Sequence, residues 1–273
     1  MKFTVGISPC PNDTFIFDAM YHSLIDTDGM SFEFIFEDVE TLNKLAQQGK
    51  LDMVKMSYAN YFSVLDNYIM LRSGSALGNG VGPLLIAKEN FPIQEISNLS
   101  IAIPGIHTTA NFLLSFAFPE SQNRIALPFS DIENKVLQGE FQAGVIIHEN
   151  RFTYQDKGLI QLLDLGEYWE QKTELPIPLG GIAIRRNLSE EMQSQINFLI
   201  HSSISYSRKS YPLLSQFVKN HAQEMDEAVM LKHIDLYVNE NTFEISANGV
   251  DAVTKMGSIL QQNYSLPLFI KTN

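Results

Sequence analysis

The chain has 273 residues and a formal net charge of −12, with 45% hydrophobic and 18% charged residues. This balance is typical of a globular protein and excludes disorder, which requires few apolar residues and dense charge. The acidic charge argues against a nucleic-acid partner, because neutralising phosphates requires clustered Lys and Arg, but it does not exclude a small anionic ligand.

The chain opens with a strand, a loop and a helix. Residues 2–7 are rich in β-formers, SPCPND (8–13) is a turn-forming loop, and residues 14–23 are compatible with a helix. Asn12 or Asp13 is the expected N-cap of this helix, because a short side-chain oxygen can accept the first unpaired amide hydrogens.

A second strand–helix unit follows directly. A strand over 31–36 leads to a helix over 39–48, with Asp38 as its N-cap and Gly49 as its C-terminal glycine. A third strand is expected over 51–56.

The same order of elements recurs further along the chain. Strands are expected over 100–103 and 141–147, and helices over 110–118 and 131–138, the latter ended by Gly139. The repeat predicts two similar α/β lobes, each with a mainly parallel sheet.

Two segments mark the crossings between these lobes. The chain crosses near the glycine-rich stretch 74–83 and returns near 176–186, which restores a strand to the first lobe. We therefore expect a first lobe made of 1–92 and 174–273, and a second lobe made of 93–173. The part of the first lobe after residue 189 is expected to be largely helical.

The glycines of residues 74–83 do not form a nucleotide-binding motif. They lie between predicted strands, without a G-x-G-x-x-G that opens a helix and without the Lys-Ser/Thr of a P-loop. We attribute them to hinge and turn geometry rather than to phosphate binding.

In α/β sheets, ligands bind beyond the carboxyl ends of the strands. That rule selects four segments: SPCPNDTF (8–15), KMSYANY (55–61), PGIHTTANF (104–112) and IIHENRFTY (146–154). If the lobes face each other, all four converge on one cleft.

His148 is the strongest candidate for chemistry. It follows residues 143–147, which predict a buried strand, so it emerges where ligands bind. A neutral imidazole, with an unperturbed pKa of ~6.5, can accept a proton at physiological pH. The alternative is a ring satisfied by a neighbouring carboxylate such as Glu149.

Two further segments could bind an anion. His107, Thr108 and Thr109 precede a predicted helix, whose first amides suit a carboxylate or phosphate; the alternative is ordinary N-capping by a threonine. Strand alternation places Lys55 and Ser57 on the same side, where they offer a cation and a hydroxyl. The alternative is a solvated lysine, with Ser57 capping a helix over 58–66.

The first loop offers Ser8, Asn12, Asp13 and Thr14 as pocket candidates. Asp13 could hold a substrate hydroxyl or orient a base. Cys10 is the only cysteine, which excludes an intrachain disulfide and a multi-thiolate metal site. It lies between two prolines and is expected to pack rather than to act as a nucleophile.

The other histidines give no metal or catalytic signal. Those at positions 22, 201, 221 and 233 lack metal-ligand spacing, and no serine nucleophile elbow, kinase motif set or H-E-x-x-H is present. His233 and Tyr237 would share a helix face, but a four-residue spacing is expected by chance.

The opening of the chain also bears on its location. It lacks the apolar stretch of a secretory signal, and no window approaches the ~18 apolar residues of a membrane span. From a native start at Met1, we expect a cytoplasmic protein.

Several long motifs, in order, closely resemble those of the 1,4-dihydroxy-6-naphthoate synthases, which act in the futalosine route to menaquinone. The resemblance covers about the first two-thirds of the chain and weakens across the C-terminal helices. Its motifs are SPCPNDTFIF (8–17), EDVETLN (37–43), KMSYANY (55–61), LRSGSALGNGVGPL (71–84), PGIHTTA (104–110), IIHENRFTY (146–154), DLGEYWE (164–170) and LPIPLGGIAIRR (175–186).

The resemblance implies a two-lobed α/β fold of the periplasmic-binding-protein-like (type II) class, with the ligand cleft between the lobes. It implies conversion of cyclic dehypoxanthine futalosine into 1,4-dihydroxy-6-naphthoate and dihydroxyacetone, without cofactor or metal. The partner is then a small-molecule carboxylate substrate, and the sequence makes no prediction of oligomeric state.

The resemblance also assigns roles to particular residues. The family's proton-accepting histidine falls on His148. Its substrate-contacting segments fall on Lys55, Met56 and Ser57 and on Thr109 and Ala110, with Met56 varying a hydrophobic position. The residues of the first loop match the family but are taken only as pocket candidates.

Two other functions fit the same fold. Chorismate dehydratase, the sister enzyme of the pathway, eliminates water from chorismate, and a solute-binding protein would bind without reacting. The strings SPCPNDTF and HENRFTY favour the naphthoate synthase, and the missing signal segment counts against an exported binding protein.

Overall fold

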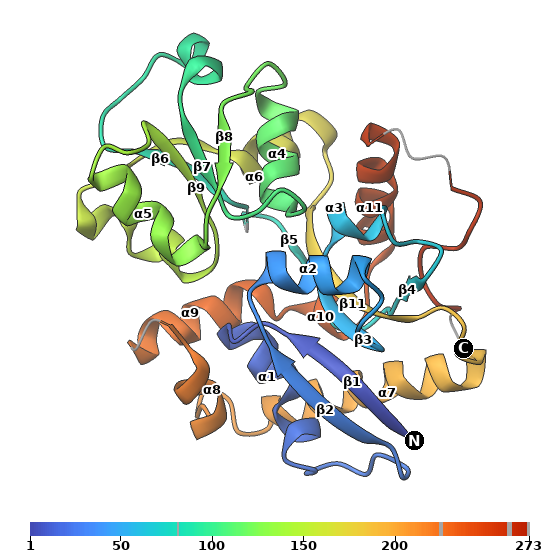
Figure 1. The fold of residues 1–273 in the computed structure, drawn as a ribbon. Helices are drawn as coiled ribbons and strands as arrows, with labels where there is room; N and C mark the ends of the chain where they lie inside the picture. Colours follow the sequence, from blue (N-terminus) through green and yellow to red (C-terminus); the bar gives the residue numbers. More distant parts are fainter. Residues whose placement is uncertain (81, 224–225, 261–263, 272–273) are drawn as a thin grey trace.

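The computed structural model describes residues 1–80, 82–223, 226–260 and 264–271 and shows two lobes, each built on a β-sheet (Figure 1). The first sheet has the order β2-β1-β3-β11-β4, with β5 also paired to β11, and the second has the order β10-β6-β9-β7-β8. The strands of the first sheet are β1 (Lys2–Ile7), β2 (Ser31–Phe36), β3 (Met53–Ser57), β4 (Tyr68–Met70), β5 (Ala76–Gly78) and β11 (Ile177–Arg185). Those of the second are β6 (Leu84–Ala87), β7 (Ile101–Ile103), β8 (Arg124–Ala126), β9 (Ala143–Ile146) and β10 (Ile160–Asp164).

Helices surround both sheets. The second lobe carries α4 (Thr109–Ala117), α5 (Phe129–Leu137) and α6 (Leu165–Thr173), and short 3₁₀ segments lie at 93–98, 148–152 and 154–157. The first lobe carries α1 (Pro11–Tyr21), α2 (Val39–Gln47), α3 (Tyr58–Tyr61), α7 (Glu190–Arg208), α8 (Gln216–His221), α9 (Glu227–Tyr237), α10 (Glu240–Phe243) and α11 (Ala247–Ile259). Helix α9 contacts both α1 and the 148–152 segment of the other lobe, so it spans the boundary between the lobes. The expectation of a helical C-terminal part is confirmed for the described residues.

The sheets are mixed rather than mainly parallel, which corrects the prediction from strand–helix alternation. β1 pairs in parallel with β2 and β3, but β11 is antiparallel to β3, and β6 is antiparallel to β9. Strand β11 re-enters the first sheet after crossing from the other lobe. No strand–helix–strand connection within one sheet therefore constrains its direction.

The chain crosses between the lobes in the segments that the sequence indicates, but the predicted boundary at 92/93 is wrong. β5 lies in the first sheet and β6 in the second, and β11 returns to the first. Because β6 forms its ladders with β9 and β10, residues 84–87 belong to the second lobe.

Helix α2 has the N-cap that the sequence predicts, whereas α1 does not. Asp38 accepts hydrogen bonds from the amides of residues 40 and 41, and Gly49 has the left-handed φ of +63° that follows a helix end. Helix α1 instead begins at Pro11, three residues earlier than predicted, with Cys10 at the N-cap position and no side-chain cap. Asn12 and Asp13 therefore lie within the first turn, and their side chains are available for other contacts.

One of the buried apolar clusters contains side chains from both lobes, beside a separate cluster within each lobe. Leu42 and Tyr58 of the first lobe belong to the same buried cluster as Leu113 and Trp169 of the second. This shared core holds the lobes against each other around the cleft.

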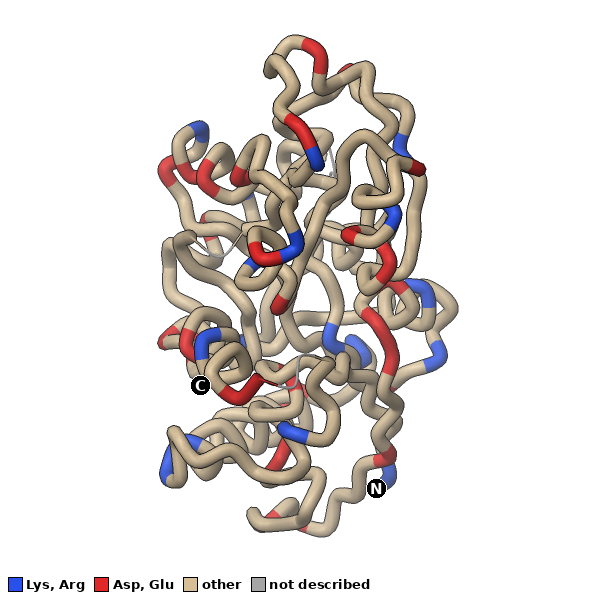
Figure 2. The backbone as a smooth tube through the Cα atoms, turned by 90° about the vertical axis from the view of Figure 1, so that its left-hand side faces the viewer, with Lys and Arg blue, Asp and Glu red and all other residues tan. Residues whose placement is uncertain are grey.

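Charge is dispersed over the molecule. Figure 2 shows Lys and Arg positions spread along both lobes among Asp and Glu positions, without one basic block. Within the described residues, no helix has both the length and the apolar character that a membrane crossing requires.

Candidate active site

A cavity that is partly open to solvent lies between the two lobes. It collects side chains from all four of the segments that follow predicted strands, together with residues of β11 and α9. The lining residues are Ser8, Asn12, Asp13, Val39, Leu42, Lys55, Met56, Ser57, Ala76, Pro83, Thr108, Thr109, Ala110, Ile147, His148, Leu179, Gly180, His233 and Tyr237.

His148 enters this cavity from a strained turn. Strand β9 is buried along its whole length, and the chain turns at His148 with a φ of +57° before the 3₁₀ segment 148–152. Left-handed backbone is uncommon for a non-glycine residue, and it persists where the surrounding structure enforces it. The turn places the imidazole at the strand end, at the boundary between the lobes.

The ring of His148 is held neutral. Phe129 packs against it edge-on, with 5.0 Å between ring centroids, and the buried Nε2 has no hydrogen-bond partner among the described residues. Burial lowers the pKa of His148 to about 4; Lys55 acts in the same direction, and the carboxylates of Asp13 and Asp38 oppose it. At neutral pH the imidazole is therefore uncharged and can accept a proton.

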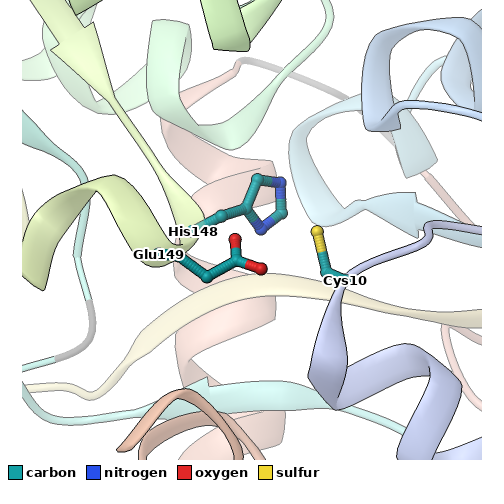
Figure 3. Close-up of side chains that lie close together, drawn as sticks. All are labelled: Cys10, His148 and Glu149. Atoms are coloured by element: carbon teal, nitrogen blue, oxygen red, sulfur yellow. The ribbon is translucent and has the colours of Figure 1, made fainter. Parts of the chain in front are cut away.

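Cys10 and Glu149 lie beside this imidazole. Figure 3 shows the three side chains pointing toward one another, with the thiol coming from the loop before α1. The ligand atoms of the three residues all lie within 4.8 Å of one another. Glu149 is thus close to the ring, as the alternative interpretation of His148 expects, and yet Nε2 remains unpaired.

Within the described residues, this trio is the group whose donors could hold a metal ion. Burial and the negative charge of Glu149 raise the pKa of the Cys10 thiol well above its usual range. Metal binding and nucleophilic attack both require a thiolate. The environment therefore opposes both roles and fits the expected packing role of Cys10.

Lys55 is buried and paired, not solvated. Its Nζ lies 2.8 Å from Oδ1 of Asp13 and donates to the carbonyl oxygen of Gly74 at 3.2 Å. Asp13 also accepts from Oγ of Ser8 at 2.7 Å and from Nδ2 of Asn12 at 2.8 Å. The first turn of α1 thus supplies a counter-charge for Lys55, a role for Asp13 that the capping prediction missed.

Ser57, which lines the cavity, forms a polar pair with the buried Asn43 behind it. Asn43 donates from Nδ2 to Oγ of Ser57 at 3.1 Å and accepts from the Ser57 amide at 3.0 Å. Helix α3 ends at Tyr61, and Ser57 makes no side-chain cap to it. Asn43 is not among the predicted site residues; the signal in the sequence was an amide beside the apolar positions of α2.

The start of α4 faces the same cavity. Thr108 caps the helix by accepting from the amide of Asn111 at 3.2 Å, as the capping alternative expects. Thr109 donates to the carbonyl oxygen of Leu179 at 2.7 Å and accepts from the Ala59 amide at 3.3 Å. Thr108, Thr109 and Ala110 thereby bring the positive end of the helix dipole to the cavity.

Two candidates lie outside the cavity lining. Thr14 is fully buried and bonds to the carbonyl oxygens of Cys10 and Pro11. His107 instead joins the lobes: its amide donates to Oε2 of Glu40 at 3.0 Å, and its Nδ1 lies 3.1 Å from Nε2 of Gln47.

Helix α9 contributes two residues that the sequence analysis dismissed. His233 and Tyr237 both line the cavity, with their rings 4.5 Å apart. Their four-residue spacing gave no usable signal, because the placement of α9 over the cleft depends on tertiary packing.

Fold and site together define a class: a two-lobed α/β protein with the periplasmic-binding-protein-like fold and a cavity between its lobes. The structure superposes on the periplasmic aliphatic sulphonate binding protein of Escherichia coli with a TM-score of 0.67, at 11% identity, covering 98% of this chain and 95% of that one. A crystal structure of an Archaeoglobus fulgidus protein gives a TM-score of 0.89 at 32% identity, covering 95% and 97%.

The sequence comparisons identify the family. The family model for menaquinone biosynthesis matches residues 3–262, so the chain belongs to that family. It is 42% identical to 1,4-dihydroxy-6-naphthoate synthase of Thermus thermophilus over 252 residues, covering 92% of this chain and 91% of the relative. It is 38% identical to the Streptomyces coelicolor enzyme of the same name over 254 residues, covering 91% and 89%.

Proposed function

We propose that the protein is a cytoplasmic carbon–carbon lyase that converts cyclic dehypoxanthine futalosine into 1,4-dihydroxy-6-naphthoate and dihydroxyacetone, without a cofactor and with His148 as general base. The observation that carries the proposal is a neutral imidazole at the cavity, whose buried Nε2 has no partner within the part of the chain that the structure describes. The relatives named as naphthoate synthases support 1,4-dihydroxy-6-naphthoate as the product.

The substrate carboxylate would be placed by the start of α4 and by Ser57. Lys55 is already compensated by Asp13, so it contributes little free positive charge to an incoming anion. The backbone amides of Thr109 and Ala110 instead offer hydrogen-bond donors together with the positive end of a helix dipole, because the Thr109 hydroxyl already donates to Leu179. Such an arrangement favours a carboxylate.

His148 would then remove a proton from a hydroxyl or an acidic carbon of the substrate. The released electron pair drives cleavage of a carbon–carbon bond, and the remaining carbocycle gains aromaticity. The carboxylate of Asp13 favours the imidazolium that forms, since it opposes the lowering of the His148 pKa. In a cleavage that consumes no other reactant, this proton is returned to the departing three-carbon unit.

The direct test is incubation of the purified protein with the cyclic futalosine derivative and, separately, with chorismate. Release of 1,4-dihydroxy-6-naphthoate from the first substrate alone supports the proposal. Elimination from chorismate would identify a chorismate dehydratase instead. Tight binding of either compound without turnover would identify a binding protein, the function that the neighbouring sulphonate-binding fold represents.

The base role predicts that His148→Asn lowers kcat by at least about 100-fold, the usual contribution of a positioned general base, while substrate still binds. Stopped-flow kinetics and calorimetric titration measure the two effects separately. The control is His22→Asn, an exposed histidine paired with Asp18, which should turn over normally. Near-normal turnover by His148→Asn would remove His148 from the base role.

A further inference from the structure

His233 is the buried polar group that the proposed mechanism leaves unused. It is fully buried on α9 and lines the cavity, yet neither Nδ1 nor Nε2 has a hydrogen-bond partner among the described residues. A neutral imidazole has one donor and one acceptor nitrogen, and buried groups of this kind are normally paired. An unpaired ring at a cavity wall therefore indicates a missing partner.

The surroundings of His233 place that partner between the two lobes. The ring centroids of His233 and His148 are 6.2 Å apart, and the two residues come from different lobes. Asn12, also at the cavity, has a buried Oδ1 without a partner among the described residues. Unpaired polar groups of His233, His148 and Asn12, which belong to three different elements, thus face the same part of the cavity.

The chemistry of these groups favours a hydroxyl over an anion. Burial, together with the neighbouring His148 and Lys55, holds the pKa of His233 well below its usual range, so the ring carries no charge at neutral pH. A neutral imidazole and an amide oxygen match a hydroxyl, which both donates and accepts. The helix start at Thr109 and Ala110 offers the more suitable site for a carboxylate.

We propose that His233 is a second substrate-binding residue, which hydrogen-bonds a hydroxyl of the sugar-derived part of the substrate and holds that part beside His148. This inference rests on the proposed function and deepens it. It divides the cavity into a carboxylate end at α4 and a hydroxyl-recognising end formed by His233, His148 and Asn12.

The test uses His233→Phe, which keeps a ring of similar size and removes the hydrogen bonds. In the inactive His148→Asn background, calorimetry should show cyclic futalosine derivative binding about 10-fold more weakly when His233→Phe is added, the scale of one buried hydrogen bond and its desolvation. Binding of 1,4-dihydroxy-6-naphthoate, which lacks the three-carbon unit, should be nearly unchanged. His233→Gln, which retains a donor and an acceptor, should recover part of the lost affinity.

A purely structural role predicts different results. It would make His233→Phe less stable and weaken both ligands equally, whereas our inference expects the ligand-free variant to melt at or above the wild-type temperature. His201→Phe, an exposed histidine on α7, is the matched control and should bind both ligands normally. Equal weakening of both ligands, or of neither, overturns the inference. A wild-type protein without turnover overturns the proposed function as well.

Discussion

Lys55 and Asp13 show how a buried charge is controlled at the scale of single residues. Both side chains are almost fully removed from solvent, and the pair is completed by hydrogen bonds from Ser8 and Asn12 to the carboxylate. Removing two charges from water is costly, and each partner is tolerated only because the other is present. The pair therefore holds the first turn of α1 against β3.

This balance predicts that Asp13→Asn lowers the free energy of unfolding by about 3 kcal/mol, because it leaves the Lys55 charge buried without its counter-charge. Urea denaturation followed by circular dichroism measures the change. The double variant Asp13→Asn/Lys55→Met removes both charges and should be more stable than Asp13→Asn alone. If Asp13→Asn unfolds at the wild-type urea concentration, the pair does not have this role.

Single residues also mark the limit of sequence reasoning at the site. His148 is recognisable because it directly follows a buried apolar run, a purely local signal. Asn43 and His233 carry no such signal, because each is defined by what the fold brings to it: Ser57 in one case and the cavity in the other. Their side chains alone do not distinguish them from ordinary helix residues.

At the scale of elements, strand ends and helix starts build the cavity. Strands β3 and β9 deliver Ser57 and His148, and helices α1 and α4 begin beside them. The loops at these junctions are short and are held by helix caps or prolines. The functional groups are thereby positioned by rigid elements on both sides.

The N-cap of α2 gives a test of this rigidity. Asp38→Ala removes the acceptor for the amides of Glu40 and Thr41 and should lower the free energy of unfolding by about 1 kcal/mol. Thermal or urea unfolding measures it. Asp38→Asn, which retains a capping oxygen, is the matched control and should lose much less stability. Equal loss in the two variants would contradict a capping role.

At the scale of the whole molecule, the lobes are joined by a shared apolar core and by polar contacts around His107. The amide and the ring of His107 meet Glu40 and Gln47 of α2 across the boundary. These contacts hold the lobes against each other around a cavity that stays partly open to solvent.

Two neutral histidines, the half-buried His148 and the fully buried His233, also make global stability depend on pH. The pKa of His148 is lowered to about 4 and that of His233 well below its usual range, whereas both return to ~6.5 on unfolding. Below that value the unfolded chain binds more protons than the folded one. The stabilisation is therefore complete above pH ~6.5 and is lost as the pH falls towards 4.

We expect each of these histidines to lower the free energy of unfolding by up to about 1.4 kcal/mol for every pH unit below ~6.5. Urea denaturation at a series of pH values from neutral to acidic measures the slope. The free energy of unfolding of the double variant His148→Asn/His233→Phe should depend less steeply on pH than that of the wild type. The carboxylates, which also titrate in acid, are the same in both proteins. Identical slopes would mean that these histidines do not titrate as their burial requires.

The sequence by itself determined the order of elements, two lobes with crossings near 74–83 and 176–186, and a cluster of strand-end motifs that includes His148. These features depend on local propensity, apolar periodicity and capping, which act over a few residues. Tertiary structure alone decided the antiparallel entry of β11 and β6, the lobe to which 84–87 belongs, the Lys55–Asp13 pair and the placement of α9 over the cavity. Those features depend on contacts between distant parts of the chain, whose energies arise only when the lobes pack together.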